Sequence, residues 1–348
     1  MSPMLARVAD NLYWIARAIE RADTYARLLE VSHAMTRESG DVSYGARTVW
    51  EPLVEITGDM ERFEQLFHVA DEESVVQFLA TSPDNPNSIT SCLRRARQNA
   101  QSVRDLLPTD VWEALNTVYL ELAEAETGND DRERVYLLSR QVRRAVALLH
   151  GLIDGGMRRD GSWYFLRLGR FTERAEKSAR LLEVKYRLLL PDDAALIGGV
   201  ELHQWRSLLR SAGADEASRR LDVDLASPRR LAQLLVTDDR FPRSVVYCLD
   251  QVAMALTSLV AGGDIAEADT ALTLVGQTRA ALIAAESLPS QSLAERMDRV
   301  QRQCNAIDEA VALSCFAYSP GAGMELSLIH ISEPTRRTPI SYAVFCLK

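Results

Sequence analysis

The sequence repeats itself after about 155 residues, and this repeat limits the folds that the chain can adopt. Residues 17–31 read RAIERADTYARLLEV and residues 170–184 read RFTERAEKSARLLEV, so ten of the 15 positions are identical. Two later blocks recur in the same order, since Trp50, Leu53 and Gly58 match Trp205, Leu208 and Gly213, and residues 77–93 match residues 233–249. Coincidence would not preserve the order of three blocks, so we interpret the chain as a duplicated unit.

Each unit has the periodicity of packed helices. In the first, apolar residues recur at steps of three and four, as an amphipathic helix requires: Leu12, Ile15, Ile19, Ala22, Ala26 and Leu29. We find no convincing period-two alternation before residue 326. The sequence therefore predicts an all-α fold of two tandem, pseudo-symmetric helical bundles, at residues 1–155 and 156–325. The consecutive helix breakers in Asp154-Gly155-Gly156 place the predicted connector there.

Helix boundaries in the first unit follow from breakers and capping residues. Residues 50–79 are predicted to form two helices, with Gly58 near the end of the first. Asn85 is a suitable N-cap for the next helix, because Pro86 would then occupy its first turn.

Composition excludes several classes of protein. The net charge is −9 and no basic stripe stands out, which argues against a nucleic-acid partner. The five cysteines are scattered without CxxC spacing, which argues for a reducing compartment and against a zinc site. We find no signal peptide and no uncharged apolar run of membrane-spanning length. The expectation is a cytoplasmic protein without metal or cofactor.

The last segment looks foreign to the rest of the chain. Residues 326–348 read LSLIHISEPTRRTPISYAVFCLK, which resembles the conceptual translation of a transposase-type sequencing adapter. We expect this tail to be artefactual and to add nothing to stability, although its β-prone residues leave a C-terminal strand as the alternative.

The helix that recurs most clearly carries the same charges in both copies. Their three- and four-residue spacing favours ion pairs within one helix: Arg17 with Glu20, Asp23 with Arg27, Arg170 with Glu173, and Glu176 with Arg180. Arg21 and Arg174 differ, because neither has an acid at helical spacing in its own helix. An interhelical salt bridge, solvation, or a pocket for an anion or carboxylate would each satisfy them. We predict that they meet acids outside their own turns, with Glu20, Glu173 or another helix's carboxylate as the partner.

No recognisable catalytic motif accompanies these charges, since phosphate-binding, dinucleotide-binding, zinc-protease and hydrolase signatures are all missing from the sequence. Cys92 and Cys248 recur on an apolar helix face, where a cysteine usually behaves as a small hydrophobe. The tryptophans are interpreted as core anchors. The candidate binding residues are therefore the repeated charges: Arg17, Glu20, Arg21, Arg27, Arg170, Glu173, Arg174 and Arg180.

Several segments resemble the bacterial alpha-E family, a domain of unknown function named for helices with an ER motif. Residues 4–31, with Glu20-Arg21, and residues 161–184, with Glu173-Arg174, are similar to its two ER segments. NPNSI at residues 85–89, ARQNAQSVRD at 96–105 and VWEALN at 111–116 resemble its other blocks, so the resemblance covers residues 1–320. One departure is FPRSV at residues 241–245, which lacks the asparagine of NPNSI.

The resemblance also implies partners. Genes of this family typically lie beside a circularly permuted ATP-grasp ligase-like protein and transglutaminase-like proteins, by analogy an ATP-dependent system for peptide synthesis or tagging. The leading interpretation is a non-catalytic helical accessory protein that holds an anionic peptide or docks the ATP-grasp partner. The alternatives are an unrecognised enzyme that uses the ER-motif charges, and a purely structural scaffold. A cavity shared by Arg21 and Arg174 would favour ligand binding.

Overall fold

The chain folds into helices wherever the structure describes it. The computed structural model describes residues 4–38, 50–126, 132–189, 199–221, 228–284 and 293–316. Strands are absent from these stretches, so the predicted all-α class is confirmed. The tail at residues 326–348 lies outside them.

All of the helices belong to one compact unit, Met1–Ala317. Those of the first half are α1 (Ala6–Glu38), α2 (Glu51–Thr57), α3 (Met60–Leu66), α4 (Glu72–Ala80), α5 (Ile89–Ser102), the short η2 (Arg104–Leu106), α6 (Thr109–Glu126) and α7 (Arg132–Gly156). Those of the second half are α8 (Gly161–Leu189), α9 (Gly199–Ser211), α10 (Asp215–Arg220), α11 (Pro228–Ala232), η3 (Gln233–Thr237), α12 (Val245–Gly262), α13 (Asp269–Ala284) and α14 (Leu293–Cys315).

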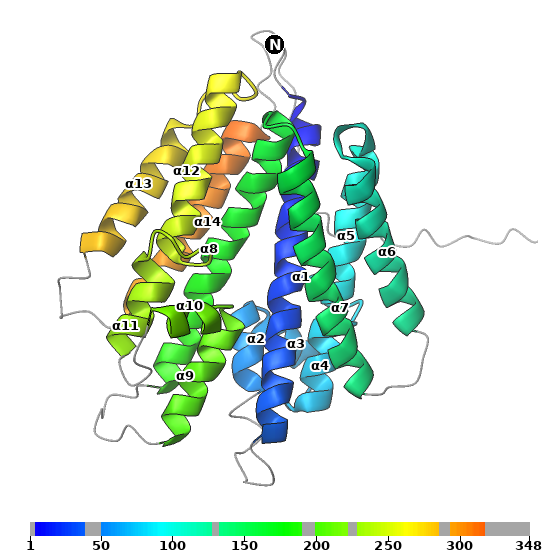
Figure 1. The fold of residues 1–348 in the computed structure, drawn as a ribbon, viewed down its shortest axis with the longest axis vertical. Helices are drawn as coiled ribbons and strands as arrows, with labels where there is room; N and C mark the ends of the chain where they lie inside the picture. Colours follow the sequence, from blue (N-terminus) through cyan, green and yellow to red (C-terminus); the bar gives the residue numbers. More distant parts are fainter. Residues whose placement is uncertain are drawn as a thin grey trace, which may run out of the picture. The chain divides into compact units, whose positions relative to one another are not determined.

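The two long helices α1 and α8 pack against each other in the middle of this unit (Figure 1). On one flank α1 packs on α5 and α7, with α6 against both of these. On the other flank α8 packs on α12 and α14, with α13 against both. Two shorter helices contact the long helix of the opposite half, since α2 packs on α8 and α9 packs on α1. The superposition of the halves and the division at residue 155 stay predictions.

Burial of α1 extends well beyond the predicted apolar stripe. All six predicted stripe residues are at most 1% exposed. The next faces of the helix are also buried, including Tyr13, Ala18 and Tyr25, because α1 has helices on both flanks. Charged residues that look solvated in a helical pattern therefore lie inside the protein, where an ion needs a partner.

A glycine permits the close approach of the two central helices. A Cβ atom on Gly169 of α8 would lie 2.2 Å from the backbone oxygen of Tyr13 in α1. No side chain fits at that separation, so α8 meets the backbone of α1 directly. Ala16, at the equivalent position of the first copy, is also small. These residues set how near the ER segments come to each other.

The predicted cap of α5 is wrong. The helix begins at Ile89, four residues after Asn85, and its N-cap is Ser88, whose hydroxyl accepts a hydrogen bond from the backbone N–H of Ser91. The buried side chain of Asn85 closes the preceding turn instead, because it donates to the carbonyl of Phe78 and accepts from the N–H of Asn87. An asparagine can serve either role, and sequence does not separate them.

Two further boundaries differ from prediction. Residues 50–79 contain α2, α3 and all of α4 except its last residue, because Gly58, with φ of 84°, ends α2 and Asp71 caps α4 through a capping box with Ser74. The glycines predicted as the connector instead form the last turn of α7, and the chain turns after Gly156. Each glycine costs the helix about 1 kcal/mol relative to alanine, and burial of Leu149 and Ile153 on α7 outweighs that cost.

By length and composition alone, α12 could cross a membrane, with a mean hydropathy of 1.5 over 18 residues. This is weak support for a membrane span, because a core helix of a soluble protein passes the same test. Eight residues of α12 are buried, and the helix packs on α8 and α13. Its apolar character is therefore accounted for by its place in the core.

Candidate functional site

The ER segments meet where α1 packs on α8, and the α8 glutamate binds two arginines of α1. Glu173 is fully buried and accepts two hydrogen bonds from Arg21, 2.6 Å from Nε to Oε1 and 2.9 Å from Nη2 to Oε2. Arg17 donates a third, 2.8 Å from Nε to Oε2. The amide oxygen of Asn87 accepts a hydrogen bond from the remaining nitrogen of Arg21. Glu173 thus accepts three charge-assisted hydrogen bonds from two arginines of α1.

The reciprocal contact forms around Glu20, which is also fully buried. Arg174 of α8 donates to both of its oxygens at 2.7 Å, from Nε to Oε1 and from Nη2 to Oε2. Arg243, in the turn before α12, adds a bond of 3.0 Å to Oε1. The prediction that Arg21 and Arg174 meet acids outside their own helical turns is confirmed, and each pairs with the ER glutamate of the other half.

Two ion pairs expected within single helices are replaced by pairs between helices. Arg17 binds Glu173 and reaches Glu176 at 2.9 Å and Asp308 at 2.6 Å, rather than Glu20. Arg170 binds Asp154 of α7 at 3.1 Å, rather than Glu173. The reason is geometric. Both ER glutamates point toward the opposite helix, where the guanidinium group of an arginine binds both carboxylate oxygens.

The remaining two expected pairs have different outcomes. Asp23 and Arg27 form the predicted pair at 2.9 Å. Glu176 binds Arg17 and Lys177 instead of Arg180. The guanidinium of Arg180 lies beneath Gly58, 3.2 Å from where a Cβ atom would stand, just as Arg27 lies 3.1 Å from such a position on Gly213. Both glycines have positive φ, so these arginines pack under helix ends of the opposite half.

The arginines that bind the two ER glutamates keep both carboxylates ionised near neutral pH. Burial by itself would raise the pKa of Glu20, yet Arg174 and Arg243 hold that pKa well below its usual value of 4.5. Burial would also raise the pKa of Glu173, but the charges of Arg21 and Arg17 outweigh this effect and lower it. Both carboxylates are therefore ionised, and a general acid or base needs a pKa nearer the working pH.

The repeated cysteines are poor nucleophiles. Cys92 and Cys248 are fully buried, as their interpretation as small hydrophobes requires. Burial raises the pKa of both thiols, that of Cys248 to about 12. The reactive form of cysteine is the thiolate, which such an environment disfavours. No group of three or more His, Cys, Asp or Glu side chains in the described stretches is placed to hold a metal ion.

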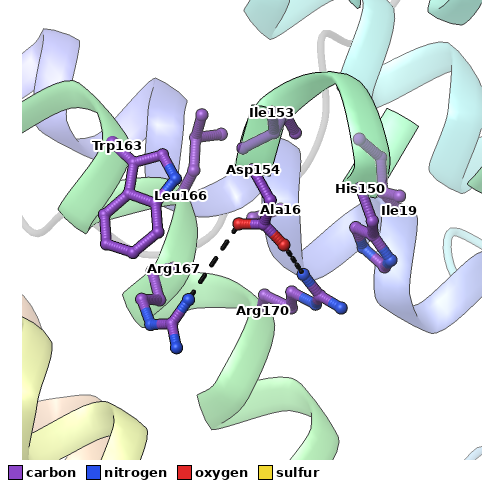
Figure 2. Close-up of a pocket in the computed structure, with 9 residues that line it drawn as sticks. All are labelled: Ala16, Ile19, His150, Ile153, Asp154, Trp163, Leu166, Arg167 and Arg170. Carbon is purple, nitrogen blue, oxygen red and sulfur yellow. Dashed lines mark hydrogen bonds and ion pairs between the residues drawn. The ribbon is translucent and has the colours of Figure 1, made fainter. Parts of the chain in front are cut away.

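A small hollow of about 20 Å³ that opens to solvent lies beside the Glu20 contact, between α1, α7 and α8. Figure 2 shows Asp154 between two arginines of α8, with Arg170 at 3.1 Å and Arg167 at 4.0 Å. The walls are mostly apolar or aromatic: Ala16, Ile19, Ile153, Trp163 and Leu166. Arg170 alone of the predicted binding residues lines this hollow, and the two ER arginines do not line it.

His150 of α7 completes the rim of the hollow. Burial and the neighbouring Arg170 lower the pKa of its imidazole to about 3, so the ring is neutral at physiological pH. Its Nε2 lies 3.7 Å from a Glu20 oxygen, which connects the hollow to the ER contact.

Sequence reasoning missed two of the four side chains that contact Glu20, His150 and Arg243, and the neighbouring Asp154 and Arg167. Asp154 was assigned to a connector, and His150 and Arg167 carry no motif. A signal existed for Arg243, because FPRSV places an arginine where the first half has Asn87. That difference alters the charge of one ER contact and leaves the other unchanged.

Comparison with known proteins gives a family but no activity. The sequence model of a family described as a predicted alpha-helical domain with a conserved ER motif matches residues 4–316. The Uncharacterized protein Rv2567 of Mycobacterium tuberculosis is 26% identical over 278 residues, which cover 73% of this chain and 30% of that protein. The Uncharacterized protein Mb2597 of Mycobacterium bovis matches with the same identity and coverage.

The chain thus spans about 30% of the length of the curated relatives that it matches. No solved structure matches.

Proposed function

This chain belongs to the Alpha-E family, and on that premise we propose that it is a non-catalytic helical accessory protein of an ATP-dependent peptide synthesis or tagging system. In this proposal the chemistry belongs to a circularly permuted ATP-grasp ligase-like partner, with a transglutaminase-like protein in the same system. The Alpha-E protein docks the ligase-like partner in the cytoplasm and presents an anionic peptide to it.

One observation carries the proposal, namely that the ER-motif charges neutralise each other. Arg21 is bound to Glu173 and Arg174 to Glu20; Glu20, Glu173 and Arg174 are buried, and the side chain of Arg21 is 13% exposed. A buried carboxylate with two arginine partners neither takes up a proton near pH 7 nor reaches a substrate. The enzyme alternative needs these groups to be available, whereas an accessory role needs only the helix–helix joint that they form.

The length of the relatives supports an association with a further protein. In the Mycobacterium tuberculosis relative, the region that matches this chain is 30% of the protein. A domain of a longer chain contacts its neighbouring domains through interfaces that resemble those between separate proteins. The identity of the partner rests on the family resemblance alone.

The experiment is co-expression of the full chain with the ATP-grasp ligase-like protein encoded beside it, followed by gel filtration and an assay of ADP release with added peptides. We expect the two proteins to co-elute, and ADP release to require the ligase-like protein. An ATP-grasp ligase encoded elsewhere in the genome is the control and should elute separately. Separate elution of the neighbouring pair would reject the proposal, as would ATP or peptide turnover by the helical protein alone.

A further inference from the structure

Positive charge gathers on α5 and η2, although the net charge of the chain is −9. Residues 85–104 hold four arginines and no acidic residue: Arg94, Arg95, Arg97 and Arg104. They form no continuous basic run in the sequence. Within the stretches that the structure describes, none of the four takes part in an ion pair, whereas the arginines of the ER contacts all have carboxylate partners.

Two of these arginines stack with aromatic side chains of α6, which lies at the outer edge of its flank (Figure 1). The guanidinium carbon of Arg97 lies 5.1 Å from the ring centre of Tyr119 and 5.6 Å from that of Trp112. The guanidinium carbon of Arg104 lies 4.9 Å from the ring centre of Trp112. The four side chains therefore alternate along the contact of α5 with α6, in the order Tyr119, Arg97, Trp112, Arg104, and we call them the arginine–aromatic ladder.

The ladder holds its arginines in place and leaves most of their hydrogen-bond donors available. When a guanidinium group stacks on a ring, its N–H bonds point outward from its edge. Arg97 uses one donor, from Nε to the amide oxygen of Asn116 at 2.7 Å. Its terminal nitrogens and the exposed side chain of Arg104 have no acceptor among the described residues. Because the rings restrict both side chains in advance, a ligand would immobilise them at a low entropic cost.

Neighbouring acids leave the charge of the ladder uncompensated. Asp105, Asp110 and Glu113 are close in sequence and exposed, yet none is within ion-pair distance of Arg97 or Arg104. Exposed charges that are further apart interact weakly, because water and salt screen them. A ligand that touches the ladder therefore meets arginines whose charge no protein carboxylate has neutralised.

We propose that the arginine–aromatic ladder binds an acidic segment of another polypeptide in an extended conformation. Arg97 and Arg104 each bind one carboxylate of that segment through their outward donors. Since both guanidinium groups lie near the same ring centre, at 5.6 and 4.9 Å, they are at most about 10 Å apart. An extended chain advances about 3.3 Å per residue, so acidic residues two or three positions apart reach both arginines. Arg94, one helical turn before Arg97, adds a third positive charge.

The stacking favours an acidic polypeptide over a single-stranded nucleic acid. Nucleic acids of that kind bind through bases that stack on free aromatic rings. Trp112 already has Arg97 and Arg104 against its ring, and Tyr119 has Arg97. Carboxylates need only the outward edges of the guanidinium groups, which the stacking leaves open.

This inference rests on the proposed function, because it names a surface for the anionic peptide of that proposal. The two can nevertheless fail separately, since the test of the ladder uses the helical chain without the ligase-like partner. Co-elution with that partner in the absence of peptide binding would remove the ladder site alone.

The test is titration of fluorescein-labelled hexaglutamate with the full chain, followed by fluorescence anisotropy. Hexaglutamine is the uncharged comparison, and hexathymidylate is the nucleic-acid comparison. We expect hexaglutamate to bind at least about tenfold more tightly than either, as a pair of charge-assisted hydrogen bonds implies. Equal binding of hexaglutamine would overturn the proposal, and tighter binding of hexathymidylate would overturn the assignment to a polypeptide.

Variants locate the site. Arg104→Gln should weaken hexaglutamate binding about fivefold or more, whereas Arg206→Gln, which removes an exposed arginine of α9, should leave it unchanged. Arg97→Lys keeps the charge but loses the planar fork, so it should weaken binding about threefold or more. Unchanged binding by Arg104→Gln would overturn the proposal, as would parental binding by an Arg97→Lys variant of unchanged helical content. Arg104 is exposed, so its variant decides the question even if Arg97→Lys fails to fold.

Discussion

Removing an ER glutamate should destabilise this protein more than removing an ER arginine. Glu173 accepts hydrogen bonds from both Arg17 and Arg21, so Glu173→Gln weakens the pairing of two buried cations at once. Arg21→Met leaves Glu173 with Arg17 still 2.8 Å away. The asymmetry follows from the number of partners and not from the burial of either residue alone.

The magnitudes follow from the burial of these groups. Breaking a buried pair by removing one partner costs about 3–5 kcal/mol, and we expect Glu173→Gln to lie in this range because Glu173 is fully buried. For Arg21→Met we expect about 1–3 kcal/mol, the cost of charged hydrogen bonds whose acceptor keeps another donor. An exposed pair gives the baseline, since Glu216→Gln disturbs Arg219 and Arg220 at the surface and should cost less than about 1 kcal/mol.

The assay is equilibrium unfolding in urea at pH 7, followed by far-UV circular dichroism and tryptophan fluorescence. Coincidence of the two transitions is checked first, because a comparison of free energies assumes two-state unfolding. If Glu173→Gln costs no more than Glu216→Gln, the ER contact is not a buried, mutually dependent charge pair. If Arg21→Met costs more than Glu173→Gln, the partner-counting argument is wrong.

Two other perturbations have defined outcomes. His150 is protonated below pH 6.5 in the unfolded chain, whereas in the folded protein burial and Arg170 lower its pKa to about 3. The free energy of unfolding should therefore fall by about 1–2 kcal/mol as the pH drops from 7 to 5. Urea unfolding of His150→Gln should lack that part of the pH dependence. Gly169→Ala places a methyl group against the backbone of Tyr13 and should lower the free energy of unfolding by at least about 1–3 kcal/mol. Gly276→Ala, in a helix with open space around it, should raise that free energy by about 0.4–1 kcal/mol. Equal melting temperatures for these two variants would contradict the close approach of α1 and α8.

Helical periodicity predicts the all-α class of this fold, because it depends on local spacing. The stripe from Leu12 to Leu29 is buried throughout, and the unpaired status of Arg21 within its own helix predicts a partner from elsewhere. Spacing along one helix could not reveal that α1 is covered on both flanks. For that reason the charges beside the stripe looked solvated in the sequence, and the pairs of Arg17 and Arg170 were assigned within single helices.

The parts that sequence missed depend on contacts between distant segments. Arg243 reaches Glu20 across 223 residues, and no local pattern encodes that distance. Asp154 and His150 come from the end of α7, whose last turn holds the two glycines that suggested a connector. Asn85 was misread because its side chain can cap a helix or close a turn, and only the position of the Phe78 carbonyl decides which it does.

The ER contact also sets the order in which the chain can mature on the ribosome. Arg21 and Glu173 are separated by 152 residues and Glu20 and Arg174 by 154, so at about 5–20 residues per second α1 waits roughly 8–30 s for its partner to be synthesised. During that interval the charges of α1 face water, and the first bundle lacks the helix that covers one of its sides. The first half thus buries its remaining apolar surface only after α8 has been synthesised, and until then that surface is exposed to aggregation.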